Sequence, residues 1–320
     1  MRVIEYDNGV VSLYGSRIPL DVLPEPSAVT VGSYDGLHRG HRQIIAKMMD
    51  VAAVRHLRSV MVTFEPHPRL VLKGDVVGPL GLLTTLDEKI ELLADTGVDM
   101  LVVIRFTPEF SLRSSDDFIR NMLVGLLGAK SIIVGYDHAF GRDRSGSRET
   151  LERLGRELDV VVEVVEALSS GDEHFSSTQI RRLLVSGRIE EANYALGSAY
   201  MITGTVVDGE KRGRQIGFPT VNLKLSDPHK LLPRSGVYCA HTAIEGVHCK
   251  ALMNIGVRPT VSSSGIISLE AHLLGYSGDL YGALLRFTLH RFLREEEQFT
   301  TLDALKTQLE KDKKTVELYC

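Results

Sequence analysis

The sequence predicts an α/β protein of two domains, in which a doubly wound parallel sheet is followed by a small antiparallel β-barrel with a terminal helix. The chain has 320 residues, more than a single hydrophobic core usually holds. From residue 28 to about residue 184, short apolar runs alternate with helix-like segments, as in parallel sheets with crossover helices. After residue 197 the segments become strand-like and rich in glycine, as in small barrels.

The first half contains five strand-like runs, which are residues 28–32, 60–64, 100–106, 131–134 and 160–165. Helix-like segments lie between them, at residues 44–56, 85–95, 116–127 and 148–158. Glu88 follows Thr85 by three residues, which is the spacing of a helix capping box. This alternation predicts helices on both faces of a parallel sheet.

The second half contains five strand-like segments, YMITGTVV, SGVYCAHTAI, HCKALMNIG, ISLEAHLLG and YGALLRFTLHRFL. The amphipathic stretch from residue 302 to about residue 318 should form a helix that packs on the barrel. We expect the domain boundary within residues 187–199.

The composition is that of an ordinary globular protein, with 43% hydrophobic residues, 24% charged residues and a net charge of −4. This charge gives no reason to expect a nucleic acid or a membrane as partner. The three cysteines lack the Cys-x-x-Cys spacing of a zinc ribbon. The first fifteen residues lack the apolar core of a signal peptide, so we expect a cytoplasmic protein.

The stretch VGSYDGLHRGH, residues 31–41, follows the first strand-like run of the predicted sheet. Ligands of doubly wound sheets bind at the carboxyl ends of strands, beside helix N-termini. Gly32, Gly36 and Gly40 would let the backbone approach a phosphate, while His38 and His41 could donate hydrogen bonds to phosphoryl oxygens. Such a site needs no nucleophile when the attacking group is already an anion. The alternative is a glycine-rich turn with two solvated histidines.

A second candidate anion site lies in FSSTQIRRLL, residues 175–184, after the last strand-like run of the first half. Ser177, Thr178 and Arg181 would place two hydroxyls and a guanidinium at a helix N-terminus. Residues of these types serve more often as an N-cap followed by a solvated basic face.

The stretch GRQIGFPTVN, residues 213–222, combines several constraints in ten residues. Thr220 and Asn222 share one face if the chain is extended there, and their neutral oxygens suit a hydrated Mg²⁺ that bridges ATP phosphates. Gly213 and Gly217 permit a tight loop over phosphates, and Arg214 adds positive charge. A strand-entry turn is the structural alternative.

Glu270 is a candidate general base, because phosphorylation of an alcohol needs a group that accepts its proton. It lies in the strand-like run ISLEAHLLG. A single strand glutamate is more often a solvated residue on the outer face, and the neighbouring residues do not decide between the two interpretations.

The first half resembles the adenylyltransferase part of the bacterial bifunctional riboflavin kinase/FAD synthetases in GSYDGLHRGH, TFEPHP, VGYDHAFGRDRSG and SSTQIRRLL. That part is a Rossmann-like nucleotidylyltransferase domain with a His-x-Gly-His motif. The resemblance implies that His38 and His41 bind the ATP phosphates with the help of Ser177, Thr178 and Arg181. It also implies that the phosphate of FMN attacks the α-phosphorus of ATP.

The second half resembles the riboflavin kinase domain of the same family in YMITGTVVDGEKRGRQIGFPTVNL, MNIGVRPTV and LEAHLLGYSGDLYG. This resemblance implies that Thr220 and Asn222 bind Mg²⁺, that Arg214 approaches a phosphate and that Glu270 takes the proton of the ribityl 5′-hydroxyl. No flavin-binding residue is assigned.

The sequence departs from the family pattern at a few positions of both halves. These positions are Tyr34, His138, Ala139, Gln179 and the stretch Gly275–Tyr276–Ser277. The departures bear on flavin affinity and turnover more than on the type of reaction.

The resemblance implies an FMN adenylyltransferase domain at residues 1–190 and a riboflavin kinase domain at residues 191–320. The expected enzyme converts riboflavin and ATP to FMN, then FMN and ATP to FAD and pyrophosphate, with Mg²⁺. Two alternatives remain: an enzyme with one silent domain, and an adenylyltransferase with a flavin-sensing barrel. A sensor needs no base, so Glu270 argues against the second alternative.

Overall fold

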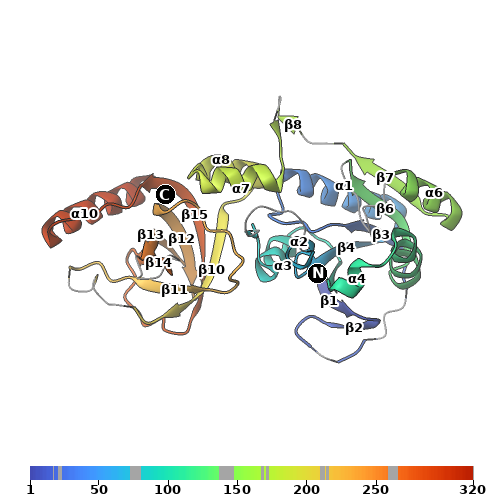
Figure 1. Ribbon diagram of the computed structural model, residues 1–320, viewed down its shortest axis with the longest axis horizontal. Coiled ribbons are helices and arrows are strands. Elements are labelled where there is room, and N and C mark those ends of the chain that lie inside the picture. The colour runs from blue at the N-terminus through green and yellow to red at the C-terminus, as the bar shows by residue number, and fades with distance from the viewer. Residues whose placement is uncertain are drawn as a thin grey trace. The chain divides into compact units, whose positions relative to one another are not determined.

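Two units make up the chain in the computed structural model, which describes all residues except 17, 21–23, 73–80, 137–147, 167–168, 171–172, 210–212, 214–215, 259–265 and 320. The first unit consists of residues 1–80 and 86–175, and the second of residues 81–85 and 176–320. The two units form the α/β part and the barrel that the sequence predicts (Figure 1).

The first unit is built on a seven-stranded sheet in the order β2-β1-β5-β4-β3-β6-β7. Its strands are β1 (Arg2–Asp7), β2 (Val10–Leu13), β3 (Ser27–Val31), β4 (Arg58–Glu65), β5 (Met100–Arg105), β6 (Ala129–Gly135) and β7 (Val161–Val165). Neighbouring strands are parallel except β1 and β2, which form an antiparallel hairpin. The five expected strands are confirmed, and the edge hairpin was not predicted. Strands β8 (Ser169–Ser170) and β9 (Glu173–His174) pair separately.

Helices cover both faces of this sheet, as the alternation predicts. They are α1 (Arg39–Arg55), α2 (Pro68–Val71), α3 (Leu86–Ala94), α4 (Pro108–Ser111), α5 (Ser115–Asp117), the π-helix η1 (Phe118–Leu126) and α6 (Arg148–Leu158). Helices α1 and α3 contribute to the apolar cluster on one face, and η1 and α6 to the cluster on the other. Strand β3 lies between these clusters, so all five of its residues are buried.

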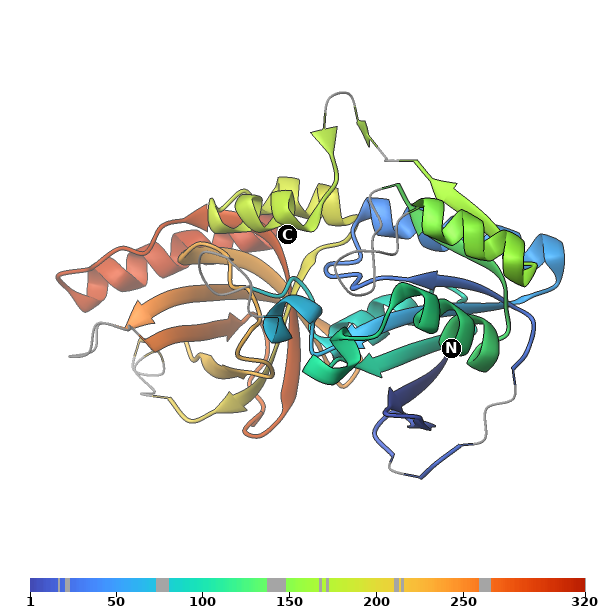
Figure 2. The ribbon, with the colours of Figure 1, turned by 45° about the vertical axis from the view of Figure 1, so that its right-hand side comes forward.

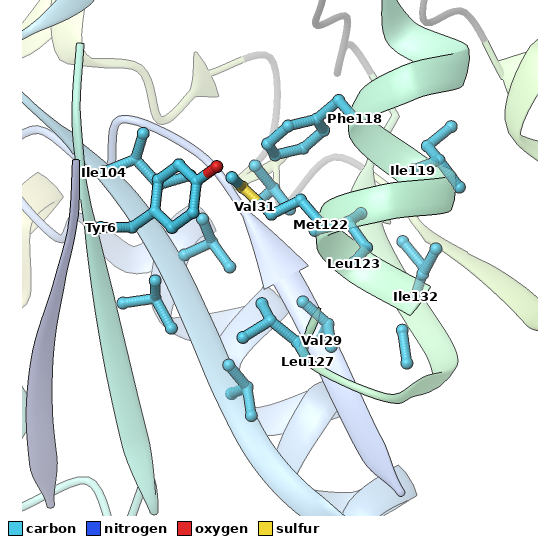
Figure 3. Packing of buried hydrophobic residues seen from close by; sticks show 14 of the residues in the cluster. Tyr6, Val29, Val31, Ile104, Phe118, Ile119, Met122, Leu123, Leu127 and Ile132 are labelled. Carbon is cyan, nitrogen blue, oxygen red and sulfur yellow. The ribbon is translucent and has the colours of Figure 1, made fainter. Parts of the chain in front are cut away.

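The helix expected at residues 116–127 is confirmed, and most of it is the π-helix η1, a type that the sequence pattern did not specify. At its end the amide of Leu127 donates to the carbonyl of Met122 at 3.0 Å, five residues back. The wider turn directs Phe118, Met122 and Leu123 together against the strands (Figure 3). A π-helix is thus compatible with close packing of this face of the sheet.

The second unit is a closed antiparallel barrel in the order β10-β11-β14-β13-β12-β15, in which β15 also pairs with β10. Its strands are β10 (Tyr200–Val207), β11 (Val221–Leu225), β12 (Gly236–Ile244), β13 (Val247–Arg258), β14 (Ile266–Leu273) and β15 (Leu284–Arg294). Helices α7 (Ser177–Val185), α8 (Ile189–Leu196) and α10 (Leu302–Tyr319) complete the unit (Figure 2). The expected barrel and terminal helix are confirmed.

Helix α10 is fixed to the outside of the barrel by an apolar contact and a buried ion pair. Val316 is fully buried in a cluster with Val237 and Leu252. The Arg294 guanidinium donates to both carboxylate oxygens of Asp312, with its Nη2 2.8 Å from Oδ2. Asp312 is only 5% exposed, so removal of either partner would leave a charge without compensation.

A short segment from the middle of the chain, residues 81–85, belongs to the second unit. The ammonium group of Lys230 donates to the carbonyl of Leu83 at 2.7 Å, and Nε of Arg181 donates to the carbonyl of Gly81 at 2.8 Å. Helix α7 also groups with the barrel, upstream of the boundary region expected from the sequence. Within the part of the chain that the structure describes, no helix has the length and apolar character needed to cross a bilayer.

Candidate active sites

The first candidate site is the turn between β3 and α1, at the carboxyl end of β3. Strand β3 has β4 on one side and β6 on the other, so this end of β3 is the switch point of the sheet. The turn is left-handed at Tyr34 (φ +47°), Gly36 (φ +88°) and Leu37 (φ +44°). Residues other than glycine rarely adopt this backbone conformation. Tyr34 and Leu37 are both nearly fully buried, so packing holds the strained turn in place.

The two histidines of the motif lie face to face at the start of α1. Their ring centroids are 3.6 Å apart, with an interplanar angle of 19°. His38 caps the helix, because its Nδ1 accepts the backbone N–H of His41 at 3.4 Å. In neutral His38 the proton therefore lies on Nε2. A Cβ on Gly40 would approach the His38 ring to 3.3 Å, so glycine leaves room for the stacked pair.

His41 is a neutral hydrogen-bonding group at physiological pH. Burial lowers its pKa well below the usual histidine value, and the nearby His38 and Lys89 lower it further. Its Nδ1 is buried and has no hydrogen-bond partner among the described residues. A buried polar atom without a partner is rare in folded proteins, so His41 stands out among the residues of this turn.

Gly32 joins the strand to the turn. Its amide donates to the carbonyl of Val62 at 3.0 Å, and a Cβ at this position would lie 3.0 Å from the Tyr34 ring. Lys89, which the sequence analysis did not single out, lies below the turn and donates to the carbonyl of Ser33. Its position in an amphipathic helix gave no signal of this contact.

The residues of the second candidate anion site lie at a helix N-terminus in the second unit. Ser177 and Thr178 are the first two residues of α7, and the Ser176 hydroxyl caps the helix by accepting the N–H of Gln179 at 3.3 Å. Arg181 follows one turn later and uses its Nε to hold the segment 81–85.

The barrel brings together Thr220, Asn222 and Glu270, as the sequence analysis expected of one site. Asn222 is the direct partner of Glu270 in the register between β11 and β14. The Thr220 hydroxyl donates to Oε2 of Glu270 at 3.3 Å, and the Ser268 hydroxyl donates to Oε1 at 3.1 Å. Along β14, Leu269, Ala271 and Leu273 are buried, so Glu270 lies on the less buried face.

The loop before β11 is closed by contacts that require glycine. A Cβ on Gly213 would lie 2.1 Å from the carbonyl oxygen of Phe218, whose amide donates to the Gly213 carbonyl at 2.8 Å. Gly217 is left-handed, with φ +83°. Nδ1 of His272 donates to the carbonyl of Pro219 at 2.8 Å, a contact that the sequence analysis missed.

Three residues that the sequence analysis singled out lie outside the described part of the chain: Arg214, His138 and Ala139.

A cavity of about 560 Å³ opens beside this group of residues. Thr220, Leu273 and residues 276–281 line it. The stretch Gly275–Tyr276–Ser277, which departs from the family pattern, therefore borders a cavity large enough for a substrate group.

The donor set of the barrel site fits Mg²⁺. The oxygens of Thr220 and Asn222 are hard ligands, which Mg²⁺ prefers. Among the described residues, no group of three or more His, Cys, Asp or Glu side chains could hold a metal ion. A site built from these oxygens suits an ion that shares its coordination with substrate phosphates and water.

Comparisons with known proteins match both halves of the chain. The family model for FAD synthetase matches residues 21–179, and the model for riboflavin kinase matches residues 196–320. A bifunctional riboflavin kinase/FMN adenylyltransferase from Listeria monocytogenes is 34% identical over 286 residues, which cover 89% of each chain. The Escherichia coli K12 protein of the same name is 36% identical over 295 residues, which cover 91% of this chain and 92% of that one.

A solved structure has the same overall chain fold. It is described as a macrolide-efflux protein from Streptococcus pneumoniae, and it aligns with a TM-score of 0.83 and 27% identity over 94% of this chain and 97% of its own. The two family models match in sequence order, and the relatives align over most of both chains. The chain therefore belongs to the bifunctional riboflavin kinase/FMN adenylyltransferase family.

Proposed function

We propose that the chain carries out the two reactions of its family at two separate sites. Riboflavin is phosphorylated at the barrel, and FMN is adenylylated at the turn after β3. The observation that carries this proposal is the pairing of β11 with β14, which places Glu270 against Thr220 and Asn222 within one unit. The stacked pair His38 and His41 belongs to the other unit.

At the barrel, the attacking group is a neutral ribityl hydroxyl, so a base is needed. The Glu270 carboxylate takes the hydroxyl proton as the oxygen bonds to the γ-phosphorus of ATP and the bond to the β-phosphate oxygen breaks, releasing ADP. The hydroxyls of Thr220 and Ser268 fix the orientation of the carboxylate. Thr220 and Asn222 would hold Mg²⁺, which neutralises phosphate charge when bound. Gly213 and Gly217 shape the loop over the phosphates, and Arg214, which lies between them in the sequence, would add positive charge.

At the turn after β3, the attacking group is the phosphate of FMN, which is already an anion. It bonds to the α-phosphorus of ATP as pyrophosphate leaves, so no base is required. Nε2–H of His38 and the imidazole of His41 donate to the phosphoryl oxygens as their negative charge increases. Gly36 makes the left-handed step of the turn, and Gly32 and Gly40 leave space for the backbone and the stacked rings.

We infer a second phosphate-binding site at the N-terminus of α7. The hydroxyls of Ser177 and Thr178 and the Arg181 guanidinium supply donors for phosphate oxygens at a helix N-terminus. We place the reactions in the cytoplasm, where ATP is available, with flavins and ATP as the partners. The net charge of −4 argues against a nucleic acid.

Incubation of the pure protein with riboflavin and MgATP, followed by separation of the flavins over time, tests the proposal. FMN should form first and FAD should follow. FMN alone would show that the α/β unit is silent, and binding of riboflavin without any product would favour a flavin sensor.

A further inference from the structure

A buried lysine lies beneath the turn of the first candidate site. Lys89 of α3 is only 4% exposed, although lysine is among the residues that are least often buried. Transfer of an ammonium group from water to the protein interior costs several kcal/mol unless other groups compensate for the charge. The proposed mechanism gives this lysine no role, so its position needs an explanation.

The contacts of Lys89 converge on the first residues of the turn. Its Nζ donates to the carbonyl oxygen of Ser33 at 2.7 Å and to the Thr63 hydroxyl at 3.0 Å. The Thr63 hydroxyl in turn donates to the same Ser33 carbonyl at 3.2 Å. Ser33 stands between the end of β3 and the left-handed residue Tyr34. Lys89 and Thr63 therefore fix the point at which the chain leaves the sheet.

The charge of Lys89 is also part of the electrostatics of this site. Burial lowers the pKa of Lys89 below its ordinary value, and the nearby Asp35 and Glu65 partly offset this by stabilising the ammonium form. The positive charge of Lys89 in turn affects His41. Together with His38, it disfavours protonation of His41 and so lowers the pKa of that histidine further than burial alone. Lys89 is thus close enough to the histidine pair for its charge to matter.

We propose that Lys89 is a positioning residue for FMN adenylylation, whose ammonium group holds the Ser33 carbonyl and so sets the turn that presents His38 and His41. This inference rests on the proposed role of the two histidines. The strained turn explains why an anchor is needed: three of the four residues from 34 to 37 are left-handed, and a turn of this kind persists only when its surroundings fix it.

A similar polar clamp elsewhere in the same unit provides a control. At the start of β4, the hydroxyl of the fully buried Ser59 donates to Asp99 at 2.6 Å and accepts the Asp99 amide at 2.9 Å. This clamp lies at the opposite end of β4 from Thr63. Ser59→Ala should lower stability without changing the turn, so it separates loss of a buried clamp from loss of the anchor.

The test compares Lys89→Met with Ser59→Ala and His41→Ala in the full chain, and measures kcat and KM for FAD formation from FMN and MgATP. Lys89→Met should lower kcat by about 100-fold, as expected for reacting groups displaced by about 1 Å. Its rate of FMN formation from riboflavin should not change. Ser59→Ala should keep kcat for FAD formation within about threefold of the parent, since its clamp lies away from the turn.

Titration of ¹³C-labelled histidine by NMR adds a measurement that a purely structural role would not change. The pKa of His41 should rise in Lys89→Met, because one of the two positive groups that act on it is gone. If Lys89→Met does not fold, Thr63→Val removes one donor from the Ser33 carbonyl and should lower kcat for FAD formation about tenfold, the effect of one hydrogen bond.

The outcomes distinguish the inference from the function on which it rests. Normal FAD formation in His41→Ala would refute the assigned site itself. Loss of FAD formation in His41→Ala together with a normal kcat in Lys89→Met, or in Thr63→Val if that is the variant that folds, would refute the role of Lys89 alone. An equal loss of kcat for FAD formation in Lys89→Met and Ser59→Ala would show that Lys89 only stabilises the fold.

Discussion

Replacement of Glu270 by glutamine is the sharpest test of the barrel site, because it removes basicity and little else. The carboxylate accepts hydrogen bonds from Thr220 at 3.3 Å and Ser268 at 3.1 Å. In Glu270→Gln, the amide oxygen can still accept one of these hydroxyls, and the amide nitrogen can donate to the other. The side chain should therefore keep its place, and riboflavin should still bind.

The rate of riboflavin phosphorylation should nevertheless fall by about 10²–10⁴-fold, which is the usual contribution of a general base. This range corresponds to about 3–5 kcal/mol in the activation free energy. Ser268→Ala is the matched control, because it removes one hydrogen bond from the carboxylate and leaves the base in place. Its effect should stay near tenfold, equivalent to one hydrogen bond of about 1.5 kcal/mol.

The assay measures initial rates of each step, with riboflavin affinity followed by flavin fluorescence. Supplied with FMN directly, Glu270→Gln should form FAD at close to the parental rate, because that step needs no base. An unchanged rate of riboflavin phosphorylation would remove Glu270 from the mechanism. Loss of riboflavin binding would make it a residue that positions the substrate.

Further predictions concern the histidine turn, the cation and the terminal helix. His41→Ala should lower FAD formation by about 10²–10³-fold and leave FMN formation nearly intact, as measured by flavin separation; equal loss of both would show that the sites are not independent. Chelation of Mg²⁺ should stop both reactions, whereas Asn222→Ala should weaken riboflavin phosphorylation alone; FMN formation without metal would contradict the assignment. Asp312→Ala should lower the free energy of unfolding by about 3–5 kcal/mol in urea titrations, because the Arg294 side chain, only 16% exposed, would lose its carboxylate partner, and a loss below 1 kcal/mol would contradict this. The folded-state pKa of His41 lies below its unfolded value of about 6.5, so below that pH the unfolded chain binds a proton that the folded chain does not. Stability should therefore fall with decreasing pH below about 6.5, and His41→Ala should show a weaker fall in the same titrations.

The sequence predicted the regular elements well where apolar periodicity is strong and local. The central strands of the sheet and the barrel strands fall within a few residues of the expected runs. The edge hairpin β1–β2 was missed, because its strands are short and only Ile4, Tyr6 and Val11 among their residues are buried. The pattern predicted a helix at η1 but not its type, because a π-helix has nearly the same apolar pattern as an α-helix over nine residues.

The residues of the candidate sites likewise fall into two groups, those that are close in the sequence and those that only the fold brings together. His38 and His41 are three residues apart, so their motif could be recognised in the sequence itself. Glu270 and Asn222 come together only through the register of β11 with β14, which periodicity does not specify. The role of Lys89 depends on a turn and a strand that are 56 and 26 residues away, and an amphipathic helix pattern does not indicate such contacts.

The closure of the barrel has a consequence for the order in which it can form during synthesis. Strand β15 completes the ring by pairing with both β10 and β12, and it is the last barrel strand in the chain. Until β15 has left the ribosome, β10 and β12 each expose an unpaired edge that could add a strand from another nascent chain. The α/β unit is complete in sequence more than a hundred residues earlier, at residue 175. A pause in translation before residue 284 would therefore leave a folded α/β unit attached to a barrel that is prone to aggregation.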